Sequence, residues 1–168
     1  SSAWKSIMAT GGRSGELVYA EVEAYAVASQ TNLGKIGLSN NFLQGLGYLG
    51  ENTGNLDGAN SPMKCACVWG GQPNSVVGWT SANAVSIGTI TAGTRIRIAV
   101  NGVTGKAWIG KVGSAWPNSG DPAADTNPWI TGIDSRVFIA ASIYTGSGNT
   151  WRLHVDAGDF TGSVPSGF

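Results

Sequence analysis

The chain has 168 residues, of which 42% are hydrophobic and only 12% are charged, and its ten basic and ten acidic side chains cancel. This sparse, balanced charge excludes electrostatic attraction to nucleic acid or to an anionic membrane, so a partner must be held by shape, stacking and hydrogen bonds. No run reaches the roughly 18 apolar residues that a membrane-spanning helix needs.

The length predicts one domain over residues 1–168, large enough to bury a core without metal or disulfide support. The chain starts at Ser1 rather than at a methionine, which suggests a piece excised or processed from a longer protein. Its 26 glycines, spread between short apolar runs, are typical of many turns rather than long helices.

The first strong strand pattern runs from Leu17 to Tyr25. Apolar and polar residues alternate there, which predicts a central strand with one face in the core and the other polar or wet. The two faces are Val18, Ala20, Val22 and Ala24, and Tyr19, Glu21, Glu23 and Tyr25. We expect Trp4–Thr10 to form an edge strand before it and Lys35–Leu38 to be its pairing partner.

Residues 40–62 have no sustained period and are crowded with glycine and asparagine. A loop of this length is uncommon unless it packs on itself or has a function, and its apolar residues favour packing on the core. Met63–Trp69 is the next candidate strand, followed by a turn over 70–74 and a short strand at Val76–Trp79.

Cys65 and Cys67 lie two positions apart in this candidate strand. Neighbours along one strand have poor geometry for a disulfide, and further metal ligands are not evident nearby. We therefore expect two unpaired, buried thiols.

The clearest pattern in the chain is a β-hairpin within residues 86–113. From Arg95 to Val100, branched apolar residues alternate with arginine and alanine, so that Ile96, Ile98 and Val100 share one face. Residues 101–105 supply two glycines for a reversal, and the second strand, Lys106–Lys111, turns Trp108 away from Ala107 and Ile109. A second long irregular segment follows at Ser114–Asp134.

Two more strands are expected near the end of the chain, at Arg136–Tyr144 and Trp151–Asp156. In the second of these, Trp151, Leu153 and Val155 share a face, and His154 lies on the other. Many short strands, long loops and no helical periodicity predict an all-β sandwich or barrel.

The hairpin block and its surroundings resemble the SPRY/B30.2 family. Residues 88–113, GTITAGTRIRIAVNGVTGKAWIGKVG, are similar to its most diagnostic block, although the block ends in Lys-Val-Gly where the family has Lys-Asn-Gly. Residues 116–124, WPNSGDPAA, look like the variant found in phage and prophage proteins. The stretches 15–23, 34–38, 135–144, 151–155 and 164–168 are similar to further family strands in the same order.

The resemblance implies a bent antiparallel β-sandwich of the concanavalin-like jelly-roll type, with essentially no helix. Because SPRY domains generally bind partners through loops and share no catalytic centre, it also implies a non-catalytic recognition module without a cofactor. The phage-like variant suggests a virion or extracellular, tail-associated protein that binds a host-surface glycan or protein. A structural domain that self-associates within, or decorates, a virion is an alternative.

Aromatic residues on loops are the strongest functional pattern. Two tryptophan pairs bracket polar segments, and an indole face beside short polar side chains suits sugar or protein recognition. The predicted ligand-binding residues are Trp69, Trp79, Trp116, Asn118, Asp121, Asp125 and Trp129. The structural alternative is that some of these rings cap the ends of the sandwich. We assign Trp151 and Trp4 to the core and leave Trp108 open.

A glycoside hydrolase that uses Glu21 and Glu23 is an alternative function. Jelly-roll glycosidases use paired carboxylates as acid and nucleophile or base, but these usually face each other across a cleft. A Ser-His-Asp site around His154 is disfavoured, because no nucleophile elbow of the G-x-S-x-G type is present.

Calcium is a further possibility in the second irregular segment, where Asp121, Asp125, Asn127 and Asp134 could supply oxygen ligands. The spacing does not match an EF-hand. Asp-Pro and Asn-Pro pairs are also ordinary turn starters. We therefore predict no metal site.

Overall fold

The computed structural model describes residues 4–8, 15–28, 34–40, 64–69, 72–77, 79–134, 136–144 and 148–168. Its strands form two antiparallel sheets. One has the order β1-β10-β3-β4-β5 and the other β11-β2-β7-β8-β9-β6. The strands are β1 (Trp4–Met8), β2 (Leu17–Ala26), β3 (Lys35–Ser39), β4 (Cys65–Trp69), β5 (Gln72–Val77), β6 (Thr80–Ser81), β7 (Arg95–Asn101), β8 (Lys106–Lys111), β9 (Ile130–Thr131), β10 (Phe138–Tyr144) and β11 (Thr150–His154).

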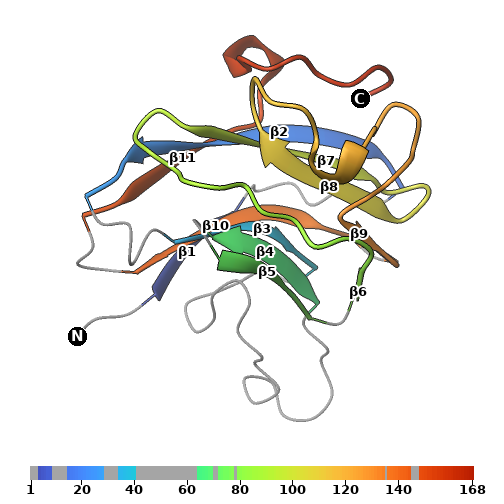
Figure 1. Ribbon diagram of the computed structural model, residues 1–168, viewed down its shortest axis with the longest axis horizontal. Coiled ribbons are helices and arrows are strands. Elements are labelled where there is room, and N and C mark those ends of the chain that lie inside the picture. Colours follow the sequence, from blue (N-terminus) through green and yellow to red (C-terminus); the bar gives the residue numbers. More distant parts are fainter. Residues whose placement is uncertain are drawn as a thin grey trace.

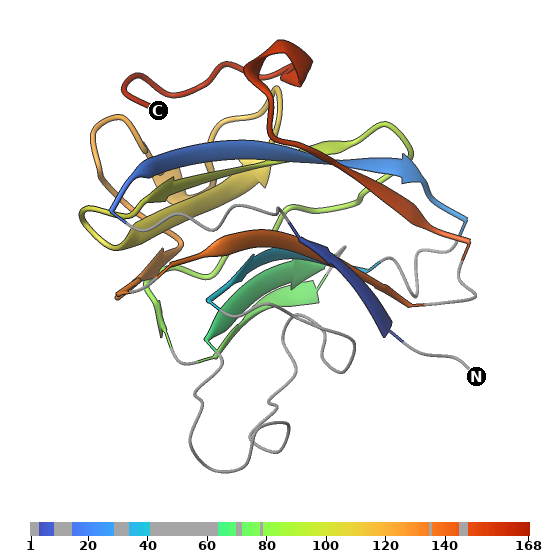
Figure 2. The ribbon, with the colours of Figure 1, turned by 180° about the vertical axis from the view of Figure 1, so that it is seen from behind.

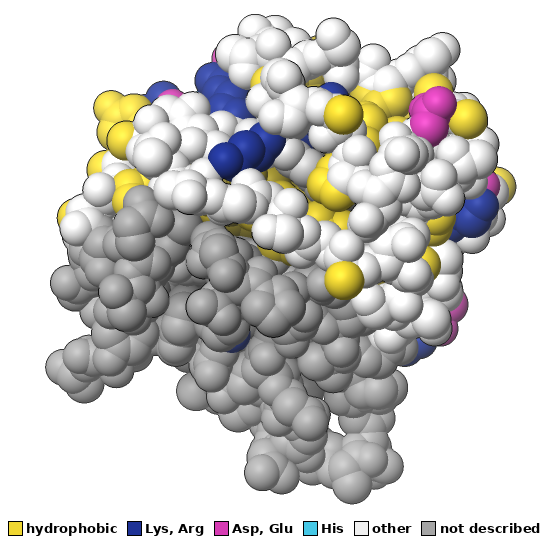
Figure 3. All heavy atoms as spheres, viewed as in Figure 1, with side chains coloured by type: hydrophobic (Ala, Val, Ile, Leu, Met, Phe, Trp, Pro, Cys, Tyr) yellow, Lys and Arg dark blue, Asp and Glu magenta, His cyan; other side chains and the backbone are white. Residues whose placement is uncertain are grey.

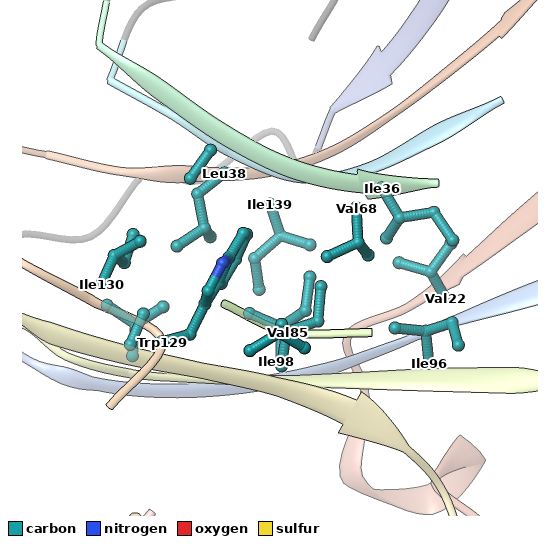
Figure 4. Close-up of a cluster of buried hydrophobic side chains, with 14 of the residues drawn as sticks. Val22, Ile36, Leu38, Val68, Val85, Ile96, Ile98, Trp129, Ile130 and Ile139 are labelled. Atoms are coloured by element: carbon teal, nitrogen blue, oxygen red, sulfur yellow. The ribbon is translucent and has the colours of Figure 1, made fainter. Parts of the chain in front are cut away.

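The two sheets stack face to face with one apolar core between them (Figures 1 and 2). Figure 4 shows side chains from both layers meeting there, among them Ile96 and Ile98 from β7 and Ile36 from β3. Helical structure in the described residues is limited to two short 3-10 turns, at Pro117–Ser119 and Ala157–Asp159. The predicted all-β antiparallel sandwich is confirmed. No helix in the described part of the chain is long and apolar enough to cross a membrane.

The hairpin forms as predicted, as β7 and β8. Ile98 pairs with Ile109 across the two strands, and both side chains are buried in the core between the sheets. On the opposite face, Ala99 pairs with Trp108, and these two join a separate apolar cluster. A two-residue period thus places alternate residues of the hairpin in two different apolar layers.

The alternation in β2 is confirmed, but its pairing partner was predicted wrongly. β2 lies between β11 and β7, whereas β3 lies in the other sheet between β10 and β4. All five residues of β3 are buried, because it is an interior strand of its own sheet. Gly37 allows this close packing, since a Cβ there would lie 1.9 Å from the Ala66 carbonyl oxygen. Sequence proximity therefore misassigned the partner.

The other strand predictions differ mainly in their bounds. β1 pairs only with β10 and is an edge strand, as expected. β5 begins at Gln72 and replaces the predicted turn at 70–74 and the short strand at 76–79. Cys67 is buried, as predicted, while the Cys65 side chain and residues 41–63 lie outside the described residues.

A third layer covers the outer face of the six-stranded sheet, where the sequence pattern predicts a polar or wet surface. The segment after β8 and the C-terminal segment, residues 155–168, lie over this face (Figures 1 and 2). Phe160, Phe168 and Trp116 pack against a buried cluster of Tyr19, Ala99 and Trp108. The outer face of β2 is therefore covered at Tyr19 and Glu21, which are 8% and 0% exposed, whereas Tyr25 at its end stays exposed.

Candidate functional site

One irregular segment between β8 and β9 is held in a defined shape on the sheet, and we call residues 116–127 the contact loop. The Trp108 indole N–H donates to the Thr126 carbonyl at 2.8 Å, which ties the loop to β8. The Asn118 amide donates to the Ala84 carbonyl at 2.8 Å, which ties it to a neighbouring loop. The Asn127 amide donates to the Ser119 carbonyl at 3.1 Å and closes the loop on itself.

Asp125 anchors the loop to the hairpin. Its carboxylate accepts from the Lys106 ammonium at 2.5 Å, from the Thr104 hydroxyl at 2.8 Å and from the Asn101 amide at 3.1 Å. Partial burial favours the neutral acid, but these donors outweigh it and lower the pKa of Asp125 below its ordinary value. The carboxylate is thus charged and its oxygens are used within the fold.

Asp121 starts a turn inside the loop. Its carboxylate accepts the main-chain N–H groups of Ala123 and Ala124 at 3.0 and 3.2 Å, as in an Asx turn. Its main chain forms an isolated antiparallel bridge with Thr126. The side chains of Asp121 and Asp125 therefore determine the shape of the loop.

The backbone of the loop is conformationally special. Among the described residues, every non-glycine residue with a positive φ lies in it: Asn118 (55°), Ser119 (56°), Asp125 (57°) and Asn127 (46°). Asparagine and aspartate tolerate this left-handed region better than other residues, but Ser119 does not share that preference. Such conformations persist only where surrounding contacts impose them. The contact loop is therefore preorganised rather than adaptable.

Trp116 begins the loop and is half-buried. The Arg97 guanidinium carbon lies 3.9 Å from the centroid of its ring, in a cation–π stack. The ring also lies close to β8, since a Cβ on Gly110 would be 3.4 Å from Trp116 Cε3 and 3.0 Å from Pro117 Cδ. The absence of a side chain at Gly110 lets the start of the loop approach the sheet.

A shallow depression of about 180 Å³, measured out to open solvent, lies beside Trp116. Its lining comprises Val85, Trp108, Ile109, Trp116, Pro117, Asn118, Asn127 and Trp129. Pockets for drug-sized molecules are typically about 300–1,000 Å³, so this depression is too small and too shallow to enclose such a molecule. Figure 3 shows hydrophobic side chains reaching the surface between polar atoms on the face it presents.

The structure separates the predicted ligand-binding residues into three groups. Trp116 and Asn118 lie together at the surface of the depression, with Asp121 and Asp125 as the framework of the same loop. Trp79 and Trp129 are only 8% and 1% exposed and belong to the core, which corrects the expectation that they form surface platforms. Figure 4 shows Trp129 standing between the sheets. The Trp69 side chain lies outside the described residues.

The structure confirms one of the sequence predictions for the other tryptophans. Trp151 is partly buried and packs against the core, as predicted. Trp108 is 2% exposed and supports the contact loop from beneath. The side chain of Trp4 lies outside the described residues.

Glu21 and Glu23 are structural groups rather than a catalytic pair. Glu21 accepts from the main-chain N–H groups of Thr161 and Gly162 at 3.1 and 2.8 Å, and from Arg95 at 3.0 Å. Burial alone would raise the pKa of Glu21, but these donors and the Tyr19 hydroxyl lower it below its ordinary value. A general acid needs the opposite shift, and no substrate reaches a carboxylate that is 0% exposed.

His154 and Glu23 form a further structural pair. The His154 Nε2 lies 2.9 Å from a Glu23 oxygen, and Arg95 and Arg152 each lie 3.8 Å from that oxygen. The ring is on the outer face of β11, as predicted, and it is 7% exposed.

The acidic residues considered for calcium are separated by other roles. Asp134 pairs with Lys64 at 2.6 Å, and Asp125 pairs with Lys106. In the part of the chain that the structure describes, no three Asp, Glu, His or Cys side chains gather in a way that could hold a metal ion.

Comparisons with known proteins support the fold. No family model matches the sequence, and no curated protein matches it. The structure is similar to the SPRY domain of human HERC1, with a TM-score of 0.51 and 10% identity, over 90% of this chain and 80% of that chain. The chain therefore has a SPRY-like β-sandwich fold, as the hairpin block predicted. The phage-type variant stays a prediction from the sequence.

Proposed function

We propose that this domain is a non-enzymatic recognition module that binds a partner protein through the contact loop. The observation that supports this most strongly is the preorganised backbone of residues 118–127, where four non-glycine residues hold left-handed conformations. A loop already fixed in one conformation loses little entropy on binding, so more of its contact energy appears as affinity. Local strain of this kind clusters at binding and catalytic sites.

The chemistry of the surface agrees with protein recognition. Asn118 and Asn127 are exposed and line the depression, and Trp116 and Pro117 form part of its apolar wall. Tryptophan and arginine are enriched among the residues that dominate the energetics of protein interfaces. The SPRY-like sandwich supplies a rigid base for such a loop, although fold alone does not determine function.

The proposal is tested by selecting binders from a displayed library of random peptides on the immobilised chain. We expect selected peptides to lose affinity for Asn118→Ala and Asn127→Ala and to retain it for Val155→Ser. Val155 is a matched control because it is 60% exposed and lies just after β11. Peptides that bind all three variants equally, or no specific peptide at all, would contradict the assignment.

The glycan expected from the sequence is the second arm of the same test. One face of the Trp116 ring is covered by Arg97, so the open indole platform that a sugar ring requires is reduced. Binding on a glycan array that depends on Asn118, with no peptide binding, would favour a glycan over a protein partner. A purely structural, self-associating domain would instead show a concentration-dependent mass in solution.

We also propose that the protein acts outside the cell on a virion or tail-associated assembly. Only the similarity of residues 116–124 to the phage-type variant supports this location. Neighbouring genes for tail or capsid proteins would support it, and a neighbourhood of cellular housekeeping genes would contradict it.

A further inference from the structure

Arg97 is a buried cation whose charge is not paired within the described chain. The residue is 8% exposed, and among the described residues its guanidinium forms no ion pair with a carboxylate. Its Nη2 donates to the Ser114 carbonyl, and its Nε is buried without a hydrogen-bond partner among the described residues. Buried charges in proteins are normally paired with an opposite charge, so this arrangement requires an explanation.

The nearest candidate for pairing is already occupied. Glu21 lies directly opposite Arg97 in the β2–β7 register, but its oxygens accept from Arg95, Tyr19 and the C-terminal segment. Burial lowers the pKa of Arg97 below its ordinary value, and the neighbouring Tyr19 and Glu21 offset this only in part. The guanidinium remains charged near neutral pH, but burial removes part of the hydration that would stabilise this charge in water.

Arg152 provides an internal comparison. Its guanidinium carbon lies 4.1 Å from the centroid of the Tyr25 ring, so it makes the same kind of stack as Arg97 makes on Trp116. Arg152, however, lies 3.8 Å from the Glu23 carboxylate, and its side chain is 53% exposed. Of these two stacks, only Arg97 on Trp116, beside the contact loop, has no carboxylate paired with its arginine among the described residues.

We propose that Arg97 and Trp116 form a subsite for an acidic side chain, at which the partner protein places an aspartate or glutamate carboxylate against the guanidinium of Arg97. This inference rests on the proposed function of the contact loop. A guanidinium fixed by the Trp116 ring and the Ser114 carbonyl is held in place to receive a carboxylate oxygen without further ordering. The partner's acid would give Arg97 the ion pair that the described part of the chain does not supply.

A protein carboxylate fits better than an acidic sugar. The guanidinium covers the indole face that a sugar ring would stack on, so an incoming group on that side meets the cation instead. The adjacent depression is shallow and open to solvent. The stack of Arg97 on Trp116 therefore favours a short acidic side chain.

A titration followed by nuclear magnetic resonance tests the subsite without needing the natural partner. The probes are N-acetyl-aspartate N-methylamide, its asparagine counterpart and glucuronate, each added to the full chain. We expect only the aspartate probe to shift the Arg97 Nε–H and Trp116 Nε1–H resonances, with the Arg152 Nε–H unchanged. No shift with the aspartate probe overturns the subsite, and a stronger shift with glucuronate overturns the protein assignment.

The selected peptides then test whether a bound protein segment places a carboxylate in the subsite formed by Arg97 and Trp116. We expect a peptide carboxylate whose replacement by its amide weakens binding to the wild-type chain by about 30-fold, and has little effect on binding to Arg97→Gln. Arg152→Gln is the control and retains the full effect of the replacement, while Arg97→Lys, which keeps charge without the planar stack, is intermediate. Peptides that depend on Asn118 but contain no acid coupled to Arg97 would contradict the subsite and leave the proposed function intact.

Discussion

The Glu21 carboxylate on β2 accepts the main-chain N–H of Gly162 at 2.8 Å and so joins two residues 141 positions apart. A side chain at Gly162 would obstruct this contact, since its Cβ would lie 2.9 Å from Glu21 Oε1 and 3.0 Å from the Tyr19 hydroxyl oxygen. The same segment places Phe160 edge-on to Tyr19, with ring centroids 4.9 Å apart. The C-terminal segment is therefore part of the folded domain.

Replacing Glu21 with glutamine should release this segment. The amide cannot accept all the hydrogen bonds that the carboxylate accepts, and Arg95 loses its buried counter-charge, so we expect the free energy of unfolding to fall by about 3 kcal/mol. Urea denaturation measures this loss, and limited proteolysis shows whether cleavage begins in residues 155–168. The control is Glu23→Gln, at a carboxylate whose side chain is 15% exposed. An unchanged midpoint with Glu21→Gln would contradict the anchoring role.

Acid should weaken the domain through the same group. The pKa of Glu21 in the folded chain lies below its ordinary value of 4.5, so its stabilisation is fully present above that pH and is lost as the pH falls through the folded pKa. Asp125, whose pKa is also lowered, adds a loss in the same direction below its ordinary value of 3.8. Urea midpoints between pH 7 and pH 3 should be flat and then fall. In Glu21→Gln the fall should be shallower, and an identical profile would exclude Glu21 as its source.

Replacing Asp125 with asparagine should loosen the contact loop while leaving the sandwich folded. The change removes the ion pair with Lys106, whose partners are partly exposed, so we expect a loss of only about 1 kcal/mol in global stability. Hydrogen exchange should accelerate in residues 121–127 and remain unchanged in β2. Uniformly faster exchange would show instead that Asp125 supports the whole fold.

Replacing Gly110 with alanine should displace the start of the contact loop. The new Cβ would lie 3.0 Å from Pro117 Cδ, so Pro117 and Trp116 must move outward. We expect affinity for a selected peptide to fall by about tenfold, because moving Pro117 and Trp116 disturbs a preorganised binding surface. Gly158→Ala is the control, since its nearest contact would be 3.7 Å away. Equal affinities in both variants would show that the position of Trp116 does not matter.

The strands were predictable where one face is buried. In β7, β8 and β2, the alternation of apolar and polar residues predicts which side chains face the core, and the structure confirms this prediction. Pairing was less predictable, because β3 follows β2 in sequence but joins the other sheet. An apolar pattern shows that a strand is buried but does not show which neighbour buries it.

The site was predictable only in part. Trp129 and Trp116 both flank the same polar segment, and their sequence context does not distinguish a core residue from a surface one. Trp129 follows Pro128 and donates its main-chain N–H to Ala107, which directs it into the sandwich, while Trp116 is stacked on Arg97 outside the sheet. That the Glu21 carboxylate opposite Arg97 pairs with Arg95 and the C-terminal segment instead depends on long-range packing and left no sequence pattern. The sequence also contains no indication that the Glu21 carboxylate accepts hydrogen bonds from the main-chain N–H groups of Thr161 and Gly162.

Hydrogen exchange with and without a selected peptide shows directly which surface of the domain binds it. We predict slower exchange in residues 116–127 and at the Ser114 end of the preceding segment, with β1, β5 and the C-terminal segment unaffected. Slower exchange confined to another surface, with the contact loop unchanged, would contradict the claim that this loop is where the domain recognises its partner.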